Sequence, residues 1–399
     1  MRTGSIARQV LRRVVGRITI GSLDVTWSNG TTEQVHGTHL GPHGTVTIHD
    51  ETGFLRALVG KGSVGLAAAY FDGIWETEDL PTFLEVGARN LDERATRRRR
   101  GGWVDRLRGF WDRRPHRMRS DAIREIGDHY NLGNDFYEQW LDETMTYSSA
   151  LFDSDEEPLA AAQNRKYERL CALLELVPGD RVLEIGCGWG GFAEYAASNH
   201  GAHVTGLTLS TEQASYANKR LERAGVSDRT EIRLKDFRDE RGMYDKAVSI
   251  EMIESVDETL WPPLFHAISR AIPPGGKAAM QAITIDERFY EGLISHTDFI
   301  KTYIFPGGAL PSLEVLQGLV ADAGLAWVSA QSHGLDYART LHCWAKRFDE
   351  AWPRLVSEDR GFDEAFHRMW RYYLAYCEAG FRTGRIDGYQ ILLERPAAD

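Results

Sequence analysis

A glycine-rich segment carries the strongest chemical signal in the 399-residue chain. It runs Glu184-Ile-Gly-Cys-Gly-Trp-Gly-Gly191 and follows a short apolar run that begins at Val182. Closely spaced glycines let a backbone turn sharply and approach a ligand. A strand that ends in such a turn and opens a helix is the setting in which proteins bind nucleotide-type ligands. The residues predicted to form this binding loop are Glu184, Gly186, Gly188, Trp189 and Gly190.

Polar side chains also follow the next two apolar runs, where strands are expected to end. Thr208 and Gln213 come after the run 203–207 and can give neutral hydrogen bonds to a ribose, although Ser210 between them can also simply cap a helix. Asp236 and Phe237 follow the run 230–234 and offer an acceptor for an adenine amine and a stacking face. Because parallel strands bind ligands at their carboxyl ends, these positions predict one adenosine-type ligand.

The glycine-rich segment resembles the E/DxGxGxG loop of class I S-adenosylmethionine-dependent methyltransferases. A dinucleotide is the main rival ligand, but the segment lacks the wider GxGxxG spacing, and the run 203–207 does not end in Asp or Glu. The resemblance implies S-adenosylmethionine as the co-substrate. It also implies a Rossmann-like α/β fold with a doubly wound, mostly parallel seven-stranded sheet.

Further motifs over residues 120–395 resemble one family, the cyclopropane-fatty-acyl-phospholipid synthases and their mycolic-acid and methyl-fatty-acid relatives. These motifs are His129-Tyr-Asn-Leu-Gly-Asn-Asp-Phe-Tyr137, Met145-Thr-Tyr-Ser-Ser-Ala150, Thr208-Leu-Ser210, Ser249-Ile-Glu-Met-Ile-Glu254, Tyr303-Ile-Phe-Pro-Gly-Gly308 and Tyr337-Ala-Arg-Thr-Leu341. The resemblance implies that Tyr147 and Ser148 contact the cofactor, and we assign Glu251 to the same set. It further implies an unsaturated phospholipid as substrate, with the acyl chain entering beside the strand ends.

The chain departs from the family at a site that binds an anion. Family cyclopropane synthases hold a bicarbonate ion with a Cys, a Glu, a His and a Tyr. This chain keeps Glu254 and Tyr337 at the matching positions, but it has Ser149 in place of the Cys and Gln281 in place of the His. Bicarbonate dependence therefore does not simply carry over, and the pattern favours the branch that contains methyl-branched fatty-acid synthases.

The chemistry that the resemblance implies depends mainly on position. An alkene is a weak nucleophile, so the sulfonium methyl group must be held in line with it. Attack leaves a carbocation, which a dry pocket with a fixed carboxylate tolerates, and a positioned base then removes a proton. We expect Glu254 to organise this site and Tyr337 to hold a carboxylate or an anion. Glu143 is a second carboxylate that can replace bicarbonate, unless it is an ordinary solvated surface residue.

Several products and activities are compatible with these residues. Loss of a proton from the added methyl group closes a cyclopropane, whereas a hydride shift before proton loss gives a methylene branch. We favour the methylene branch, which a separate reductase would convert into a methyl branch, and keep the cyclopropane as the alternative. A methyltransferase of a soluble amine or polyketide, and a non-catalytic lipid-binding protein with the same fold, are the rival functions.

The elements that position these residues are read from the spacing of apolar runs. From residue 120 onward short apolar runs alternate with helical segments, which predicts a largely parallel α/β sheet. Residues 17–50 alternate like strands and residues 53–90 look helical, which predicts a smaller α+β domain. The expected organisation is an α+β domain at 1–93, a linker at 94–119 and the catalytic domain at 120–399.

The charge distribution bears on where the protein works. Residues 94–119 hold eleven Arg and two Asp, a local charge of 11 − 2 = +9, so the other residues of this −11 chain sum to −20. Trp103, Leu107, Phe110 and Trp111 lie among these Arg residues, a pattern typical of attachment to an anionic bilayer. A solvated charge run is the alternative. Because so concentrated a basic segment is unusual for nucleic-acid binding, we expect no nucleic-acid partner.

Cysteine spacing and hydropathy complete the expected setting. The four cysteines show no CxxC pair and no metal-ligand spacing, which fits a reducing compartment, and no apolar run is long enough for a membrane-spanning helix. We therefore expect a cytoplasmic enzyme that binds the inner face of the membrane peripherally. We also expect a homo-oligomer, most simply a dimer.

Overall fold

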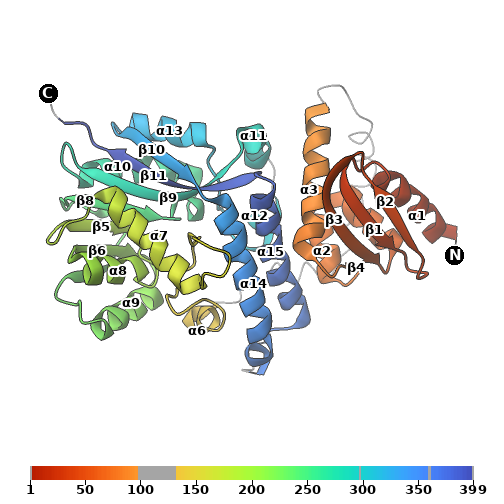
Figure 1. Cartoon of the computed structure of the whole chain (residues 1–399), viewed down its shortest axis with the longest axis horizontal. Helices are drawn as coiled ribbons and strands as arrows, with labels where there is room; N and C mark the ends of the chain where they lie inside the picture. The colour runs from red at the N-terminus through yellow and green to blue at the C-terminus, as the bar shows by residue number, and fades with distance from the viewer. Residues whose placement is uncertain (1, 98–131, 296–297, 358–360, 398–399) are drawn as a thin grey trace. The chain divides into compact units, whose positions relative to one another are not determined.

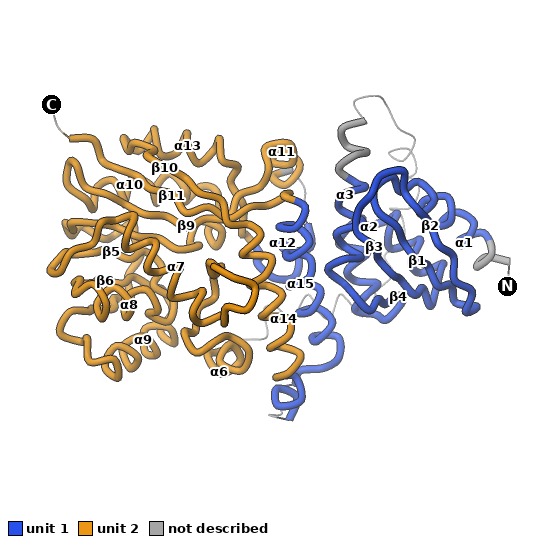
Figure 2. The backbone as a smooth tube through the Cα atoms, in the orientation of Figure 1, with its two compact units in different colours: residues 1–131, 297–306, 352–383 blue, residues 132–296, 307–351, 384–399 orange. Residues whose placement is uncertain are grey.

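The computed structural model describes residues 2–97, 132–295, 298–357 and 361–397 (Figure 1). Contacts group the chain into two compact units (Figure 2). The first comprises residues 1–131, 297–306 and 352–383, and the second comprises residues 132–296, 307–351 and 384–399. Most of the Arg-rich linker, residues 98–119, lies outside the described residues. The aromatic side chains on which the bilayer-docking prediction depends therefore lie outside them too.

The first unit contains a four-stranded sheet of order β2-β1-β3-β4. Its strands are β1 (Ile20–Thr26), β2 (Thr32–His36), β3 (His39–Ile48) and β4 (Trp75–Glu76). Alternation along β1 buries Leu23 and Val25, because successive side chains of a strand point to opposite faces. Helices α1 (Arg2–Val15), α2 (Glu51–Phe71) and α3 (Leu80–Arg97) complete this part of the unit. The strands expected within residues 17–50 and the helices expected within residues 53–90 are present.

Helix α1 packs on its own unit. Its Leu11 is fully buried, and its Arg8 donates to the Glu51 carboxylate at 2.6 Å. Arg12 forms an ion pair with Glu33, and both guanidinium groups lie 5.8 Å from the centre of the Trp27 ring. Two of the basic side chains of this helix are thus already paired with acidic residues of the same unit.

Two helices from the second half of the sequence group with the first unit. They are α12 (Phe299–Tyr303) and α15 (Glu364–Arg382). Buried aromatic contacts account for the grouping: the Tyr372 ring lies 5.7 Å from Tyr70 and 4.9 Å from Phe299, centre to centre. The contact grouping therefore differs from a division of the chain at residues 93 and 120. Aromatic pairs of this kind stabilise a fold by about 0.5–1.5 kcal/mol each beyond their buried area.

The second unit is built on a seven-stranded sheet of order β10-β11-β9-β8-β5-β6-β7. Strand β11 pairs antiparallel with both β10 and β9, and all the pairings among β5 to β9 are parallel. Its strands are β5 (Arg181–Ile185), β6 (His203–Thr208), β7 (Thr230–Leu234), β8 (Lys246–Ile250), β9 (Lys277–Ile285), β10 (Ala326–Ser332) and β11 (Ile386–Glu394). This arrangement confirms the doubly wound, mostly parallel α/β sheet expected from the sequence.

Helices cover both faces of this sheet, and two apolar cores result. On β5, Leu183 and Ile185 enter one core while Val182 enters the other, as the alternation of a strand requires. The first core contains side chains of α10 (Trp261–Ala271) and α13 (Leu313–Asp322). The second contains side chains of α7 (Leu159–Leu174), α8 (Gly191–His200) and α9 (Thr211–Arg223). The unit is completed by α6 (Gly133–Glu138), α11 (Glu287–Ser295) and α14 (Gly334–Ser357), the last of which continues into the first unit.

Among the described residues, no helix is both long enough and apolar enough to cross a membrane.

Candidate active site

The glycine-rich loop connects β5 to α8 at the centre of the sheet. The backbone N–H groups of Gly186 and Cys187 donate to the carbonyl oxygen of Leu207 at 3.0 and 2.9 Å, which ties the loop to β6. Gly188 has a φ of 51°, and a Cβ atom added there would meet nothing within 4 Å. Gly190 has a φ of 82° and packs so closely that a Cβ would lie 3.0 Å from that of Ala217. The loop is thus packed at one end and open at Gly188, where a ligand can approach bare backbone.

Side chains around this loop fit an adenosine-type ligand. The Trp189 indole N–H donates to Asn134 Oδ1 at 2.8 Å, which fixes the ring beside the loop. Glu184 is buried, and its Oε2 atom has no hydrogen-bond partner among the described residues. Burial raises the pKa of Glu184 well above its ordinary value, against the opposing positive charges of Arg220 and Lys166. A buried carboxyl group with an unpartnered oxygen at the head of an open glycine loop suits hydrogen bonding to S-adenosylmethionine.

The structure brings Thr208 and Gln213 together at the end of β6. The Thr208 hydroxyl donates to Gln213 Oε1 at 2.9 Å, while the backbone N–H of Gln213 donates to Ser210 Oγ at 3.2 Å. Ser210 is therefore the N-cap of α9, as one of the two interpretations of this motif expected. Its role as a cap also fixes Gln213 within reach of Thr208, so the cap and the ribose-binding pair are compatible.

Asp236 and Phe237, which follow β7, have different surroundings. Asp236 accepts hydrogen bonds from the backbone N–H of Arg238 at 2.8 Å and from its guanidinium at 2.7 Å, and this pairing lowers the pKa of Asp236. Phe237 is 6% exposed and belongs to one of the two apolar cores. Asp236 is thus held as a charged acceptor at the strand end, whereas the ring of Phe237 is largely occupied by core packing.

A hydrogen-bonded cluster forms around Glu251, the residue after β8. Tyr337 donates its hydroxyl to Glu251 Oε2 at 2.7 Å. The Gln281 side-chain amide donates to Glu251 Oε1 at 2.8 Å, and the backbone N–H of Ser149 donates to the same oxygen at 2.9 Å. The three residues that the family resemblance assigned to an anion, Tyr337, Gln281 and Ser149, therefore bind one carboxylate of this chain. In this structure the Glu251 carboxylate, expected from the sequence to contact the cofactor, is thus bound by these three residues.

The backbone of Glu251 is unusual in a way that explains this position. Its φ is 49°, in the left-handed region that costs a residue with a side chain about 1 kcal/mol or more. Its N–H donates to the carbonyl oxygen of Gln281 on β9 at 2.8 Å, so the pairing of β8 with β9 continues through the strained residue. Strained residues of this kind cluster at functional sites, where the surrounding structure holds them in place.

Glu254 supplies a second carboxylate, three residues further along. Its Oε1 atom accepts a hydrogen bond from the backbone N–H of Ile283, and its Oε2 atom has no partner among the described residues. Burial and the nearby charge of Glu251 raise the pKa of Glu254 to about 8. Glu251 also has a raised pKa because of burial, but its three donors and the charge of Lys166 favour the ionised form. Of the two carboxyls, Glu251 is therefore the one whose surroundings favour the charged form.

Of the other residues expected at the site, Glu143 is exposed, whereas Tyr147 and Ser148 are held by neighbouring side chains. Glu143 is exposed on a turn, and no hydrogen bond in the described part of the chain joins it to the cluster, so the structure gives no support to its replacing bicarbonate. Tyr147 packs against Tyr137 and Trp344, with ring centres 5.3 and 5.2 Å away. Ser148 is buried, and its hydroxyl accepts a hydrogen bond from Lys166.

Sequence analysis missed three buried polar residues around this cluster, Gln163, Lys166 and Gln390. The first two lie on the face of α7 that also buries Ala162 and Leu170. A polar pair at i and i+3 on an otherwise apolar helix face is a signal that the sequence does contain. Gln390 lies on β11, where the alternation of a strand would have placed it beside other buried side chains.

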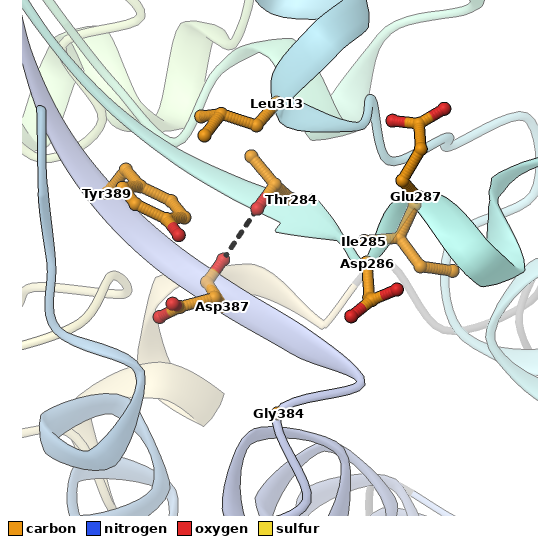
Figure 3. Close-up of a pocket in the computed structure, with 8 residues that line it drawn as sticks. All are labelled: Thr284, Ile285, Asp286, Glu287, Leu313, Gly384, Asp387 and Tyr389. Carbon is orange, nitrogen blue, oxygen red and sulfur yellow. Dashed lines mark hydrogen bonds between the residues drawn. The ribbon is translucent and has the colours of Figure 1, made fainter. Parts of the chain in front are cut away.

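A pocket opens where the end of β9 lies beside the start of β11 (Figure 3). It measures about 290 Å³, and the Thr284 hydroxyl donates across it to the carbonyl oxygen of Asp387 at 3.5 Å. Its lining consists of Thr284, Ile285, Asp286, Glu287, Leu313, Gly384, Asp387 and Tyr389. Three carboxylates among these residues make the pocket a poor site for an acyl chain.

The central glycine loop on a seven-stranded, mostly parallel sheet defines a class I S-adenosylmethionine-dependent methyltransferase. Comparison with known proteins gives the family. The family model for mycolic acid cyclopropane synthetase matches residues 117–391. This chain belongs to that family.

Individual relatives match over most of their length. The chain is 39% identical to tuberculostearic acid methyltransferase UfaA1 of Mycobacterium tuberculosis, over 98% of this chain and 92% of that protein. It is 34% identical to the cyclopropane-fatty-acyl-phospholipid synthase of Escherichia coli, over 86% of each chain. Among solved structures, mycolic acid cyclopropane synthase CmaA1 complexed with SAH and CTAB aligns with a TM-score of 0.61 and 28% identity, covering 70% of this chain and 99% of that one.

The opening at Gly188 yields a test of cofactor binding. A Cβ atom there points into free space and would stand where a ligand approaches the backbone. We expect Gly188→Ala to raise the Kd for S-adenosylmethionine about tenfold, which corresponds to ~1.4 kcal/mol. Gly225→Ala is a matched control, because Gly225 also has a positive φ of 70° and open space around its Cβ position. Calorimetric titration of both variants decides the matter, and equal affinities would contradict a ligand at Gly188.

The raised pKa of Glu254 predicts how stability depends on pH. The pKa of this carboxyl is about 8 in the folded protein and 4.5 when it is unperturbed, as in the unfolded chain. The folded protein therefore binds more protons, and the stability that this carboxyl contributes is lost as pH rises from 4.5 to 8. Glu254→Gln keeps the shape and hydrogen bond of the protonated acid. We expect the variant to gain melting temperature relative to the wild type as pH rises from 5 to 8.5, roughly in proportion to the proton released. A difference that stays constant with pH would contradict the assignment.

Proposed function

We propose that this protein transfers a one-carbon group from S-adenosylmethionine to the double bond of an unsaturated phospholipid acyl chain, giving a methylene-branched chain. One observation carries the proposal: the Glu251 carboxylate accepts hydrogen bonds from Tyr337, Gln281 and Ser149, three of the positions that the resemblance gives to an anion. The names of two relatives, a tuberculostearic acid methyltransferase and a cyclopropane-fatty-acyl-phospholipid synthase, support the same substrate class.

The cofactor supplies an electrophilic methyl group, and the protein's residues hold it and manage the charge that follows. The loop at Gly188 and the pair Thr208–Gln213 hold the adenosine part, with Glu184 as a further acceptor. Addition of the methyl group to the double bond forms one C–C bond and leaves a positive charge on the neighbouring carbon of the acyl chain. A fixed carboxylate stabilises such a charge best when its donors are already in place before the reaction.

Glu251 and Glu254 have different roles in this proposal. Glu251 is a fixed anion, because its three donors leave it little freedom to move and favour its ionised form. Glu254 has an Oε2 atom without a partner among the described residues and a pKa of about 8, so its ionised form is a well-placed acceptor for one proton. A hydride shift to the first cationic carbon followed by proton loss from the new methyl group to Glu254 gives the methylene branch.

The cyclopropane product is the second candidate, and the Escherichia coli relative at 34% identity favours it. It requires proton loss from the methyl group before any hydride shift, with ring closure onto the cationic carbon. The loss of the family's Cys and His at Ser149 and Gln281 supports the branched product instead. In that case a separate reductase supplies the hydride that turns a methylene into a methyl branch.

A phospholipid substrate also implies that the enzyme works at a membrane surface. We propose peripheral binding at the cytoplasmic face of the membrane, carried by the eleven Arg residues and the aromatic residues of the linker at 94–119. A homodimer would double the number of such basic segments at one bilayer surface. A soluble acceptor is the competing substrate class, and the linker is the feature that argues against it.

Turnover with defined lipid tests the function directly. Full-length protein is incubated with S-adenosylmethionine and vesicles of mono-unsaturated phosphatidylglycerol, and the released fatty acids are analysed by mass spectrometry. We expect a gain of one CH₂, and because methylene and cyclopropane products have the same mass, fragmentation distinguishes them. No gain on any unsaturated lipid, together with turnover of a soluble amine, would overturn the proposal.

Replacement of the proton acceptor gives a second test. Glu254→Gln keeps the hydrogen bond from Ile283 but removes the basic oxygen. We expect kcat to fall by about 100-fold or more, the usual size of a general-base contribution, with an unchanged Kd for S-adenosylmethionine. Single-turnover kinetics and calorimetry measure the two quantities. Wild-type turnover in this variant would remove Glu254 from the proposed mechanism.

The position of Glu251 predicts independence from bicarbonate. Since a carboxylate of the chain already binds to Tyr337 and Gln281, no separate anion is needed there. We expect kcat in degassed, bicarbonate-free buffer to stay within about twofold of its value with added bicarbonate, a change too small to represent loss of a catalytic group. A marked fall on depletion that added bicarbonate reverses would show that the anion is still required.

A further inference from the structure

Two buried polar residues on α7 contact the cluster from behind. Gln163 and Lys166 are one helical turn apart and both are fully buried. The Lys166 ammonium group donates to Gln163 Oε1 and to the Ser148 hydroxyl, at 2.7 Å in each case. The Gln163 amide donates to the carbonyl oxygen of Ser148 at 2.9 Å. The α7 pair thus holds both the side chain and the backbone of Ser148.

These contacts belong to a closed ring of hydrogen bonds. Ser149, next to Ser148, donates its backbone N–H to Glu251, and the Gln281 amide donates to the same carboxylate oxygen. Gln390 on β11 closes the ring, because its amide donates to Gln281 Oε1 at 2.9 Å and to the carbonyl oxygen of Lys166 at 3.4 Å. The peptide bond between Ser148 and Ser149 completes the ring, which joins α7, this segment, the residue after β8, and strands β9 and β11.

The charges around Lys166 are mostly negative. Glu251 after β8, Glu184 on β5 and Asp142 before the Ser148 segment all interact with it electrostatically. On its own helix the Tyr167 ring centre lies 4.6 Å from the ammonium nitrogen. Two further basic groups interact electrostatically with this set: His333 with Lys166, and Arg220 with Glu184. Burial lowers the pKa of Lys166 to about 7, against the opposing effect of the carboxylates.

We propose that Lys166 is a positioning residue of the methyl-transfer reaction, which fixes the Ser148–Ser149 segment and places a positive charge behind Glu251. The inference rests on the proposed function for its catalytic readout. A buried ammonium group is costly to retain unless it is paired and hydrogen-bonded. Here two hydrogen bonds and three neighbouring carboxyl groups meet that requirement. One of the two hydrogen bonds goes to the Ser148 hydroxyl, which belongs to the segment that holds Glu251.

Removal of the charge at nearly constant shape tests the role. In Lys166→Met we expect kcat to fall about tenfold or more, because a misplaced segment disturbs the reacting geometry, while the Kd for S-adenosylmethionine changes less than threefold. We also expect the apparent pKa of the acid limb of the rate profile to rise, because the glutamate pair holds its proton more firmly without the nearby cation. Arg165→Met is the matched control, since Arg165 lies on the same helix but is exposed and paired with Glu157.

Two outcomes would overturn this role. The first is a Lys166→Met enzyme with wild-type kcat and an unmoved pH profile. The second is an equal loss of kcat in Lys166→Met and Arg165→Met, which would indicate a general effect of removing charge from α7.

A stability measurement separates this inference from the proposed function. Melting temperatures of Lys166→Met, Glu251→Gln and the double variant form a cycle that needs no turnover. We expect the double variant to lose less than the two single losses combined, because each single variant leaves one buried charge without its counterpart. Additive losses would contradict the coupling. If the wild type fails on every unsaturated lipid while the cycle shows coupling, the proposed function fails and the Lys166–Glu251 interaction stands.

Discussion

The candidate site depends on the hydrogen bonds that the Glu251 carboxylate accepts. An ionised carboxylate away from bulk water needs hydrogen-bond donors, and three elements supply them: the segment at Ser149, strand β9 at Gln281 and helix α14 at Tyr337. Each donor is useful only if its element is correctly placed. The strained φ of 49° at Glu251 is the local cost of turning the side chain toward all three.

Placement of this carboxylate changes what its neighbour can do. Glu254 lies near a fixed negative charge in a poorly solvated setting, so its pKa rises to about 8 and it exchanges protons near neutral pH. The two residues therefore differ in their surroundings although their side chains are identical. The pattern is a familiar consequence of environment: one carboxyl is held ionised by donors, and the other is tuned by burial and by the charge of the first.

Much of the site follows from the sequence, and the exceptions have identifiable causes. The loop at Gly188 and the Thr208–Gln213 pair depend on local spacing after strands, which a sequence shows directly. The role of Glu251 depends on one backbone angle and on the register of β8 with β9, neither of which spacing reveals. Glu143 is close to Tyr147 in sequence, yet a turn exposes it. The roles of Gln163 and Lys166 depend on contacts with Ser148, a residue outside their own helix, which a helical pattern does not reveal.

The fold shows the same division between local and long-range information. Alternating strands and helices predict the seven-stranded sheet, because each element carries its own periodic pattern. The grouping of α15 with the N-terminal sheet depends on contacts such as Tyr372 with Tyr70, 372 − 70 = 302 residues apart, which no local pattern encodes.

Chemical rescue of Glu251→Gly tests the central claim most directly. Glycine accepts the left-handed backbone conformation of this position and removes the carboxylate that Tyr337, Gln281 and Ser149 bind. If Glu251 is a built-in replacement for that anion, the variant is nearly inactive in bicarbonate-free buffer, and added bicarbonate restores a large part of its turnover. A folded variant that binds S-adenosylmethionine and stays inactive at every bicarbonate concentration would contradict the account.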